Sequence, residues 1–160
     1  MNKVKIGVLG DSHGGFENIG LAMKHLGHVN LIIHTGDHYR DRSYIEENYH
    51  IKTIGVSGNC DQEGPDEVVQ IIHGKKYFIS HGHIYGVTHG INGIFYRGKE
   101  LGADVVIFGH THVPLNVKEE GMIILNPGSV SSPRGDSQKS CALMEIGAHR
   151  HLKVSLIELE

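Results

Sequence analysis

The 160-residue sequence lacks tryptophan and has only two cysteines and four prolines. Cys60 and Cys141 are too few for a disulfide framework, and they do not have the CxxC spacing of a zinc site. No apolar run approaches the ~20 residues of a membrane-spanning helix, since even the apolar segment 103–108 contains Asp104. The first ten residues hold too short an apolar stretch for a signal peptide. We therefore expect a cytoplasmic protein with no membrane partner.

An excess of charge of one sign is also missing. Fifteen Lys and Arg residues stand against 18 Asp and Glu residues, which gives a net charge of −3 and no block of like charges. A surface of this kind gives no reason to expect nucleic acid as a partner, whereas homo-oligomerisation stays open. The length and the 39% of hydrophobic residues suit one domain over residues 1–160 with its own core.

Short apolar segments are separated by polar turns and amphipathic segments. Over the first 60 residues the pattern of strand, turn and helix is typical of a parallel sheet with crossover helices. After that, two strands joined by His73-Gly74 predict a hairpin, and the remaining segments are mainly strands. We expect helices at 16–26 and 90–101, and strands at 4–9, 31–33, 53–57, 68–72, 75–80, 104–108, 115–118, 122–125, 141–146 and 152–159. The sequence thus predicts an α/β protein with two β layers and helices outside.

Histidine and glycine are abundant, with 14 and 22 residues, and they gather in the turns that follow strands. Five such turns are Gly10-Asp11-Ser12-His13-Gly14, Gly36-Asp37-His38, Gly58-Asn59-Cys60-Asp61, Ser80-His81-Gly82-His83 and Gly109-His110-Thr111-His112. In open α/β sheets ligands bind beyond the carboxyl ends of the strands, so we expect all five turns to meet at one edge. Glycine before the polar residue is expected to allow a sharp turn. The spacing of Asp11-x-His13 and His110-x-His112 is expected to put both side chains on one face of an extended segment.

These turns offer carboxylate, amide and imidazole groups, which suit divalent ions such as Mn, Zn, Fe or Ni. Each residue also has an ordinary interpretation: Asp11 and Asp37 can form turns or cap helices, and His81 can be a buried structural histidine. Five such turns in one chain favour a metal site, and Asp37, alone on its turn, is the candidate to bridge two ions. We expect His34 to be structural and leave His38 and His83 open between structure and function.

The series of turns resembles the calcineurin-like metallophosphoesterase superfamily, whose pattern is D-x-H, G-D, G-N-[HC]-[DE], a lone H and G-H-x-H. All five blocks occur in order within residues 10–112, and the segment 126–129 (Asn-Pro-Gly-Ser) is similar to the compact prokaryotic phosphodiesterase branch. The resemblance implies a four-layer αββα sandwich of two mixed β-sheets flanked by helices. It also implies two divalent ions, with Mn²⁺ expected first and Ni²⁺, Zn²⁺, Fe²⁺ or Mg²⁺ as alternatives. The implied metal ligands are Asp11, His13 and His112 at one ion, Asn59, His81 and His110 at the other, and Asp37 at both.

The function that the resemblance implies is hydrolysis of a small phosphate ester, by a phosphodiesterase in which a metal-bridging hydroxide attacks in line. Cys60 stands where many members have histidine, so the general acid stays open between Cys60, His38, His83 and bound water. A non-catalytic scaffold similar to the retromer cargo-sorting subunit, which binds partner proteins, is the alternative, and the intact ligand positions argue against it. The candidate catalytic residues are Asp37, Asn59, Cys60, Asp61 and His83, and the candidate substrate contacts are Asn59, His81 and Arg134.

Overall fold

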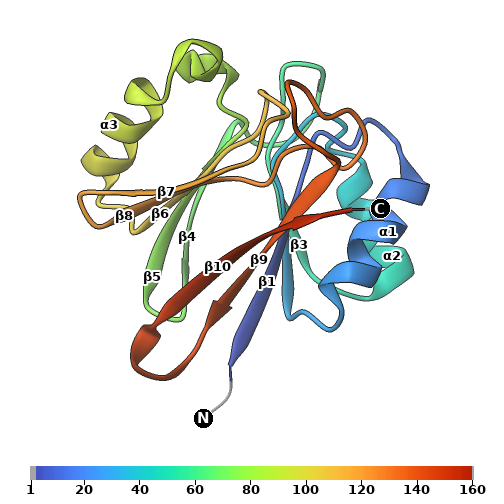
Figure 1. The fold of residues 1–160 in the computed structure, drawn as a ribbon, viewed down its shortest axis with the longest axis horizontal. Helices are drawn as coiled ribbons and strands as arrows, with labels where there is room; N and C mark the ends of the chain where they lie inside the picture. The colour runs from blue at the N-terminus through green and yellow to red at the C-terminus, as the bar shows by residue number, and fades with distance from the viewer. Residues whose placement is uncertain (1–2, 160) are drawn as a thin grey trace.

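The computed structural model describes residues 3–159 and contains two five-stranded sheets that pack face to face (Figure 1). Sheet A has the order β10-β9-β1-β2-β3, from β1 (Val4–Leu9), β2 (Leu31–His34), β3 (Thr53–Gly55), β9 (Ser140–Ile146) and β10 (Leu152–Glu158). Sheet B has the order β4-β5-β6-β8-β7, from β4 (Glu67–Ile72), β5 (Lys75–Ser80), β6 (Val105–Ile107), β7 (Leu115–Glu119) and β8 (Met122–Asn126). Both sheets are mixed: β1, β2 and β3 are parallel, as are β5, β6 and β8, and the other strands are antiparallel to their neighbours.

Helices cover the outer faces of the two sheets (Figure 1). On sheet A, α1 (Phe16–Leu26) and α2 (Asp41–Tyr49) bury Ile19 and Ile45 against Leu9 and Ile32. On sheet B, α3 (Asn92–Leu101) packs its residue Ile94 in the cluster that includes Phe78, Val106 and Phe108. Between the sheets lies a third cluster, with Val8 and Ile33 from sheet A and Ile79 and Ile107 from sheet B. The predicted four-layer αββα arrangement is confirmed. None of the helices within residues 3–159 is long and apolar enough to cross a membrane.

The predicted strands and two predicted helices are present, with shifts of one or two residues at some ends. The strand expected at 53–57 stops at Gly55, and the helix expected from residue 90 begins at Asn92, after two 3₁₀ turns at His83–Tyr85 and Val87–His89. Gly90 has a φ of 136°, which no α-helix allows. The prediction missed α2, because Ile45 is the only apolar residue that this helix buries fully and a 3.6-residue apolar pattern is therefore weak there.

Candidate metal centre

The five predicted turns lie together at the carboxyl ends of β1, β2, β3, β5 and β6. The amide of Asp11 donates to the carbonyl of Gly36 at 3.0 Å, and the amide of Gly109 donates to the carbonyl of His81 at 3.0 Å. The two sheets are joined here as well, because the amide of His110 donates to Asp11 Oδ2 at 3.0 Å. The chain therefore brings side chains that are about 100 residues apart in sequence to one site.

Four of these side chains form a compact group with the composition of a metal site. Asp11, His13, Asp37 and His112 each offer one ligand atom, and these atoms lie within 4.8 Å of one another. His112 Nε2 is 3.4 Å from Asp11 Oδ1, and His13 Nε2 is 3.9 Å from Asp37 Oδ2. Asp11 Oδ1 is buried and accepts no hydrogen bond from any described residue. A buried carboxylate oxygen without a partner is costly, so this group fits a divalent cation.

Two of the histidines are turned toward the carboxylates by backbone carbonyls. His81 Nδ1 donates to the carbonyl of Thr35 at 2.8 Å, and His112 Nδ1 donates to the carbonyl of Ser132 at 2.6 Å. Each bond fixes the tautomer that leaves Nε2 free to bind a cation. His81 Nε2 lies 3.4 Å from Asp37 Oδ2 and 3.7 Å from Asp11 Oδ1. The orientation of both rings is that of metal-binding histidines.

The remaining predicted ligands, Asn59 and His110, adjoin the same carboxylates through His81. Asn59 Oδ1 is 3.1 Å from His81 Nε2, and the ring centroids of His81 and His110 are 5.1 Å apart. Asp37 Oδ2 thus lies near the Nε2 atoms of two histidines, His13 at 3.9 Å and His81 at 3.4 Å. Asn59 and His81 thus lie next to the group of four, and His110 lies next to His81.

The electrostatics of the centre favour a charged Asp37 carboxylate. Burial alone would raise the pKa of Asp37, but the His81 imidazole and the Cys60 amide lower it below its ordinary value. Burial would likewise lower the pKa of His81, but the carboxylates of Asp37 and Asp11 raise it. The close Asp11 carboxylate also raises the pKa of His112. These shifts reflect the close pairing of the carboxylates with the imidazole rings.

The backbone of the turns corrects one expectation. Asp11 and His13 have φ values of 48° and 47°, and His110 and His112 have values of 71° and 61°, so these pairs do not lie on extended segments. All four residues have left-handed backbone instead. Such backbone costs on the order of 1 kcal/mol or more per non-glycine residue and gathers at functional sites.

The glycines of the turns also differ from the expectation in part. Gly36 has a φ of 106°, as a sharp turn requires, but Gly58 is not in the left-handed region. A Cβ atom at Gly58 would lie 2.1 Å from Asp37 Oδ1. Gly58 is therefore needed for space, because the Asp37 carboxylate packs directly against its backbone.

The two residues after Asn59 have different surroundings. Cys60 is exposed, and its amide donates to Asp37 Oδ1 at 3.0 Å. Burial of the sulfur and the negative charge of Asp37 raise the pKa of the Cys60 thiol. The Asp61 carboxylate accepts from the amides of His38, Tyr39 and Gly58, at 2.8, 3.0 and 2.8 Å. Asp61 thus fastens two of the turns to each other.

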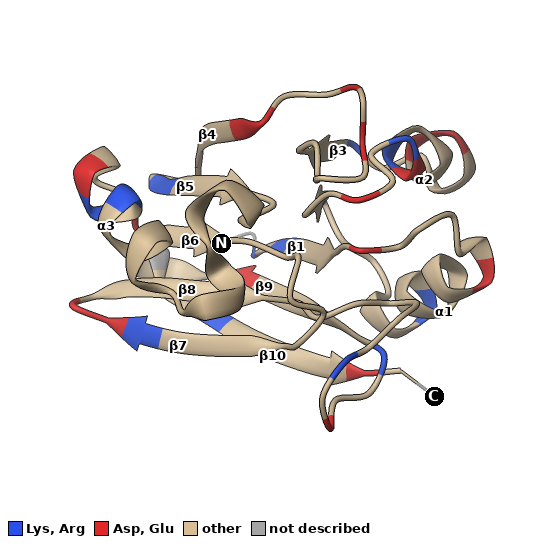
Figure 2. Cartoon of the chain, turned by 90° about the horizontal axis from the view of Figure 1, so that it is seen from above, with Lys and Arg blue, Asp and Glu red and all other residues tan. Residues whose placement is uncertain are grey.

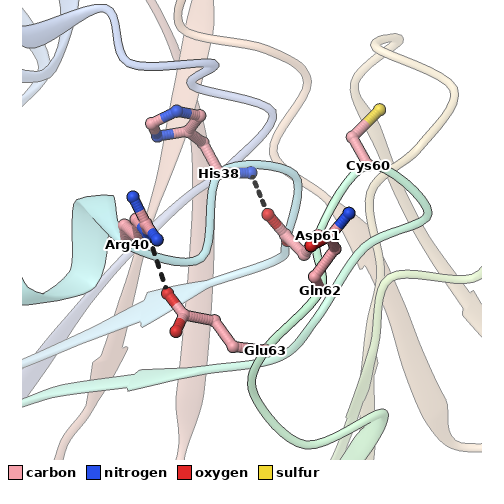
Figure 3. Close-up of a pocket in the computed structure, with 6 residues that line it drawn as sticks. All are labelled: His38, Arg40, Cys60, Asp61, Gln62 and Glu63. Atoms are coloured by element: carbon pink, nitrogen blue, oxygen red, sulfur yellow. Dashed lines mark hydrogen bonds and ion pairs between the residues drawn. The ribbon is translucent and has the colours of Figure 1, made fainter.

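A cavity of about 410 Å³ adjoins these turns (Figure 3). Its lining is polar and consists of His38, Arg40, Cys60, Asp61, Gln62 and Glu63. Arg40 Nε donates to Glu63 Oε1 at 3.0 Å across the wall of the cavity. His38 and Cys60 directly follow the candidate ligands Asp37 and Asn59, so the cavity lies beside the turns that carry them.

His83 and Arg134 lie at the edge of the centre. The His83 ring is 5.4 Å from the His81 ring, and its Nδ1 is buried with no hydrogen-bond partner among the described residues. Burial and the charge of His81 lower the pKa of His83. Arg134 is exposed, and its amide donates to the carbonyl of His112 at 3.2 Å.

A buried polar network behind the centre was missed by the sequence prediction. The Ser12 hydroxyl donates to Asp41 Oδ2 at 2.5 Å and lies 2.8 Å from His34 Nε2. The amide of Gly36 donates to His34 Nδ1 at 3.1 Å, so Nε2 carries the hydrogen and donates to Ser12. Asp41 Oδ1 is 3.0 Å from His38 Nδ1. His34 is structural, as predicted. The only sequence signal for the buried Asp41 carboxylate is the His38-x-x-Asp41 spacing, which places the two residues one helical turn apart.

Comparisons with known proteins agree with this geometry. Residues 4–149 match the model of the calcineurin-like phosphoesterase superfamily domain. The probable metallophosphoesterase YsnB of Bacillus subtilis is 35% identical over 143 residues, which cover 87% of this chain and 82% of YsnB. Phosphodiesterase YfcE of Escherichia coli K12 is 29% identical over 108 residues, which cover 59% of this chain and 53% of YfcE. The crystal structure of a predicted phosphoesterase from Streptococcus pneumoniae TIGR4 has a TM-score of 0.83 and 29% identity, and the match covers 100% of this chain and 94% of that one.

Proposed function

Since the chain belongs to the calcineurin-like phosphoesterase superfamily, we propose that it is a divalent-metal-dependent phosphodiesterase that hydrolyses a small phosphate ester. Asp11, His13 and His112 would hold one ion, Asn59, His81 and His110 the other, and Asp37 both, with Mn²⁺ as the expected metal. Bound ions of this kind lower the pKa of water and neutralise negative charge on a phosphate. The name of the YfcE relative supports a diester substrate.

The side chains around the candidate ligands have separate roles in phosphate binding, positioning and proton transfer. Asn59 and His81 are close to the carboxylates and would contact the phosphate, and Arg134 would reach it from the loop that follows His112. Asp61 is assigned a positioning role, because three backbone amides occupy its carboxylate. Cys60 has a raised pKa and is a weak proton donor. His83 has a lowered pKa and is neutral at pH 7, so it would accept a proton or hydrogen bond more readily than donate a proton.

The single observation that carries the proposal is the unpartnered, buried Asp11 Oδ1 among the candidate ligand atoms of His13, Asp37 and His112. The rings of His81 and His112 are also fixed with Nε2 toward the carboxylates. This group supports an enzyme, and measured turnover distinguishes it from the retromer-like alternative.

The test is hydrolysis of bis-nitrophenyl phosphate and nitrophenyl phosphate after chelation and after readdition of Mn²⁺. We expect Mn²⁺-dependent turnover with preference for the diester, and a loss of about 100-fold or more in Asp37→Asn. Glu119→Gln, an exposed change on β7, is the matched control and should keep full activity. Two tightly bound metals and full turnover in Asp37→Asn would contradict the bridging role. Two bound metals without turnover of any ester would favour the scaffold.

A further inference from the structure

Strand β4 is an open edge of sheet B with unusual side chains. Val69 and Ile71 have 47% and 63% of their surface exposed, and no Lys, Gly or Pro interrupts the six residues of β4. Soluble proteins usually protect such an edge with charge, proline, a bulge or a cover. The one charged residue of β4 is Glu67 at its first position, and it accepts a hydrogen bond from the Tyr85 hydroxyl at 2.8 Å, so the apolar remainder of this edge is open to a second strand.

The other three edges are protected or less apolar. β7 carries Lys118 and Glu119, both exposed, and β10 carries the exposed Lys153. β3 is three residues long, and Glu46 of α2 accepts a hydrogen bond from the amide of Thr53 there. Of the edges within residues 3–159, β4 is the one suited to pairing with another strand.

The charges at the ends of β4 indicate which strand it can pair with. Asp66 and Glu67 stand at its start, and His73 and Lys75 stand at the hairpin that ends it, as the acidic and basic segments at opposite ends of β4 and β5 show in Figure 2. A second β4 that runs antiparallel brings the acidic start of each copy to the basic end of the other. The strand is thus complementary to itself.

The hairpin also fixes which backbone groups are free. His73 and Gly74 have φ values of 49° and 80°, as a two-residue hairpin turn requires, and Ile72 is opposite Lys75. Such a turn closes on a hydrogen-bonded pair, so Ile72, Gln70 and Val68 bond to β5, and Val69 and Ile71 direct their N–H and C=O groups outward. The outward groups belong to the two residues with the exposed apolar side chains.

We propose that β4 pairs with β4 of a second copy of this chain, antiparallel and with the two-fold axis at Gln70. In this register Val69 is opposite the partner's Ile71, and Glu67 is opposite the partner's His73. Val69 and Ile71 of each copy then pack beside Ile71 and Val69 of the other, and the acidic start of each strand, Asp66 and Glu67, comes to the end of the partner's strand that holds Lys75. The two B sheets become one continuous sheet, and the chain is a homodimer. This inference does not depend on the proposed activity.

The first test is the mass of the whole chain by sedimentation or light scattering over a range of concentrations. We expect a mass that rises toward twice 17.6 kDa, and a monomer in Ile71→Lys. Leu156→Lys is the matched control, because Leu156 is a 41% exposed apolar residue on the β10 edge, and it should leave the dimer intact. A wild-type monomer at all concentrations, or a dimer that survives Ile71→Lys, would overturn the proposal.

The second test fixes the register by crosslinking in a Cys60→Ser background, since Cys141 is buried. At the two-fold axis the two Gln70 Cα atoms would be about 4.5 Å apart, within disulfide range. We expect Gln70→Cys to form a disulfide-linked dimer under mild oxidation and Val69→Cys to form little, because the two Val69 residues would be diagonal neighbours. Efficient crosslinking of Val69→Cys alone, or of neither variant, would reject this pairing. The circular dichroism spectrum of each variant checks that it is folded.

Discussion

Cys60 follows Asn59 beside the candidate metal centre, and its backbone amide donates to Asp37 Oδ1. The pKa of the Cys60 thiol is raised, so the thiol stays protonated at neutral pH but gives up its proton reluctantly. Leaving groups that need protonation should therefore react slowly in this chain, whereas nitrophenolate needs little help.

We predict that Cys60→His increases kcat for alkyl phosphodiesters by about 10-fold or more and changes kcat for nitrophenyl diesters much less. The ratio of the two rates measures proton donation separately from metal loading. Cys60→Ser is the control and should leave the ratio unchanged. An equal change for both substrates would mean that residue 60 does not serve the leaving group.

His34 gives a pH dependence of stability whose sign follows from its burial. Burial lowers the pKa of His34 to about 4 in the folded chain, against an ordinary value of 6.5. Between these pH values the unfolded chain binds a proton that the folded chain does not bind. The free energy of unfolding should therefore fall as the pH drops from 6.5 toward 4, by up to about 3 kcal/mol from this residue.

Urea unfolding of the chelated protein at several pH values measures this contribution. We expect His34→Gln to be less stable than the wild type at pH 7.5 but to lose less stability between pH 6.5 and 4.5. His25→Gln, which changes an exposed histidine of α1, should follow the wild-type curve. Parallel curves for the wild type and His34→Gln would show that His34 does not titrate in this range.

The meeting of the Asp and His turns at one end of the sheets could be predicted from the sequence, because each turn follows a short apolar strand. The backbone conformation of the turns could not be predicted from the sequence. The left-handed conformation of Asp11 and His112 depends on contacts between turns from both sheets, such as the bond from His110 to Asp11. Asp41 was missed for a similar reason, since its partner Ser12 is 29 residues away.

Among the elements, α1 and α2 show why one helix was predicted and the other was not. In α1 the apolar residues Ile19, Met23 and Leu26 recur at helical spacing and are buried. In α2 the buried residues are Ile45 and the charged Asp41. An apolar pattern does not predict a helix that is held in place by a buried carboxylate. α2 is held in place partly by polar bonds to the Gly10–Gly14 turn, which pattern analysis does not detect.

We predict that Asp41→Asn destabilises the chain by about 1–3 kcal/mol, because the amide cannot accept all the bonds that Ser12, Gly14 and His38 make to the carboxylate. The measurement is the urea midpoint of the chelated protein. Glu47→Ala, an exposed change on the same helix, should shift the midpoint little. A stability equal to that of the wild type would show that the Gly10–Gly14 turn is held in place without α2.

On the scale of the whole molecule, the candidate ligands join the two halves of the sandwich. Asp11, Asp37 and Asn59 follow strands of sheet A, whereas His81, His110 and His112 follow strands of sheet B. Beyond the apolar core, the two sheets meet at this end through the turns that carry these side chains. A cation held by these residues would contact groups from both sheets, so we expect it to stabilise the pair of sheets as one unit.

We therefore predict that Mn²⁺ at about 100 times its dissociation constant stabilises the chelated protein by about 2.7 kcal/mol, which corresponds to a rise in Tm of about 5–10 °C. His13→Ala, on the sheet A side, and His110→Ala, on the sheet B side, should each lower this rise. His28→Ala changes an exposed histidine away from the turns and should keep the full rise. Because His13 and His110 are assigned to different ions, a smaller rise in only one of the two variants would mean that only the ion assigned to that residue stabilises the chain, and an unchanged rise in both would contradict the assignment. The comparison of Tm with and without EDTA distinguishes these outcomes without reference to catalytic activity.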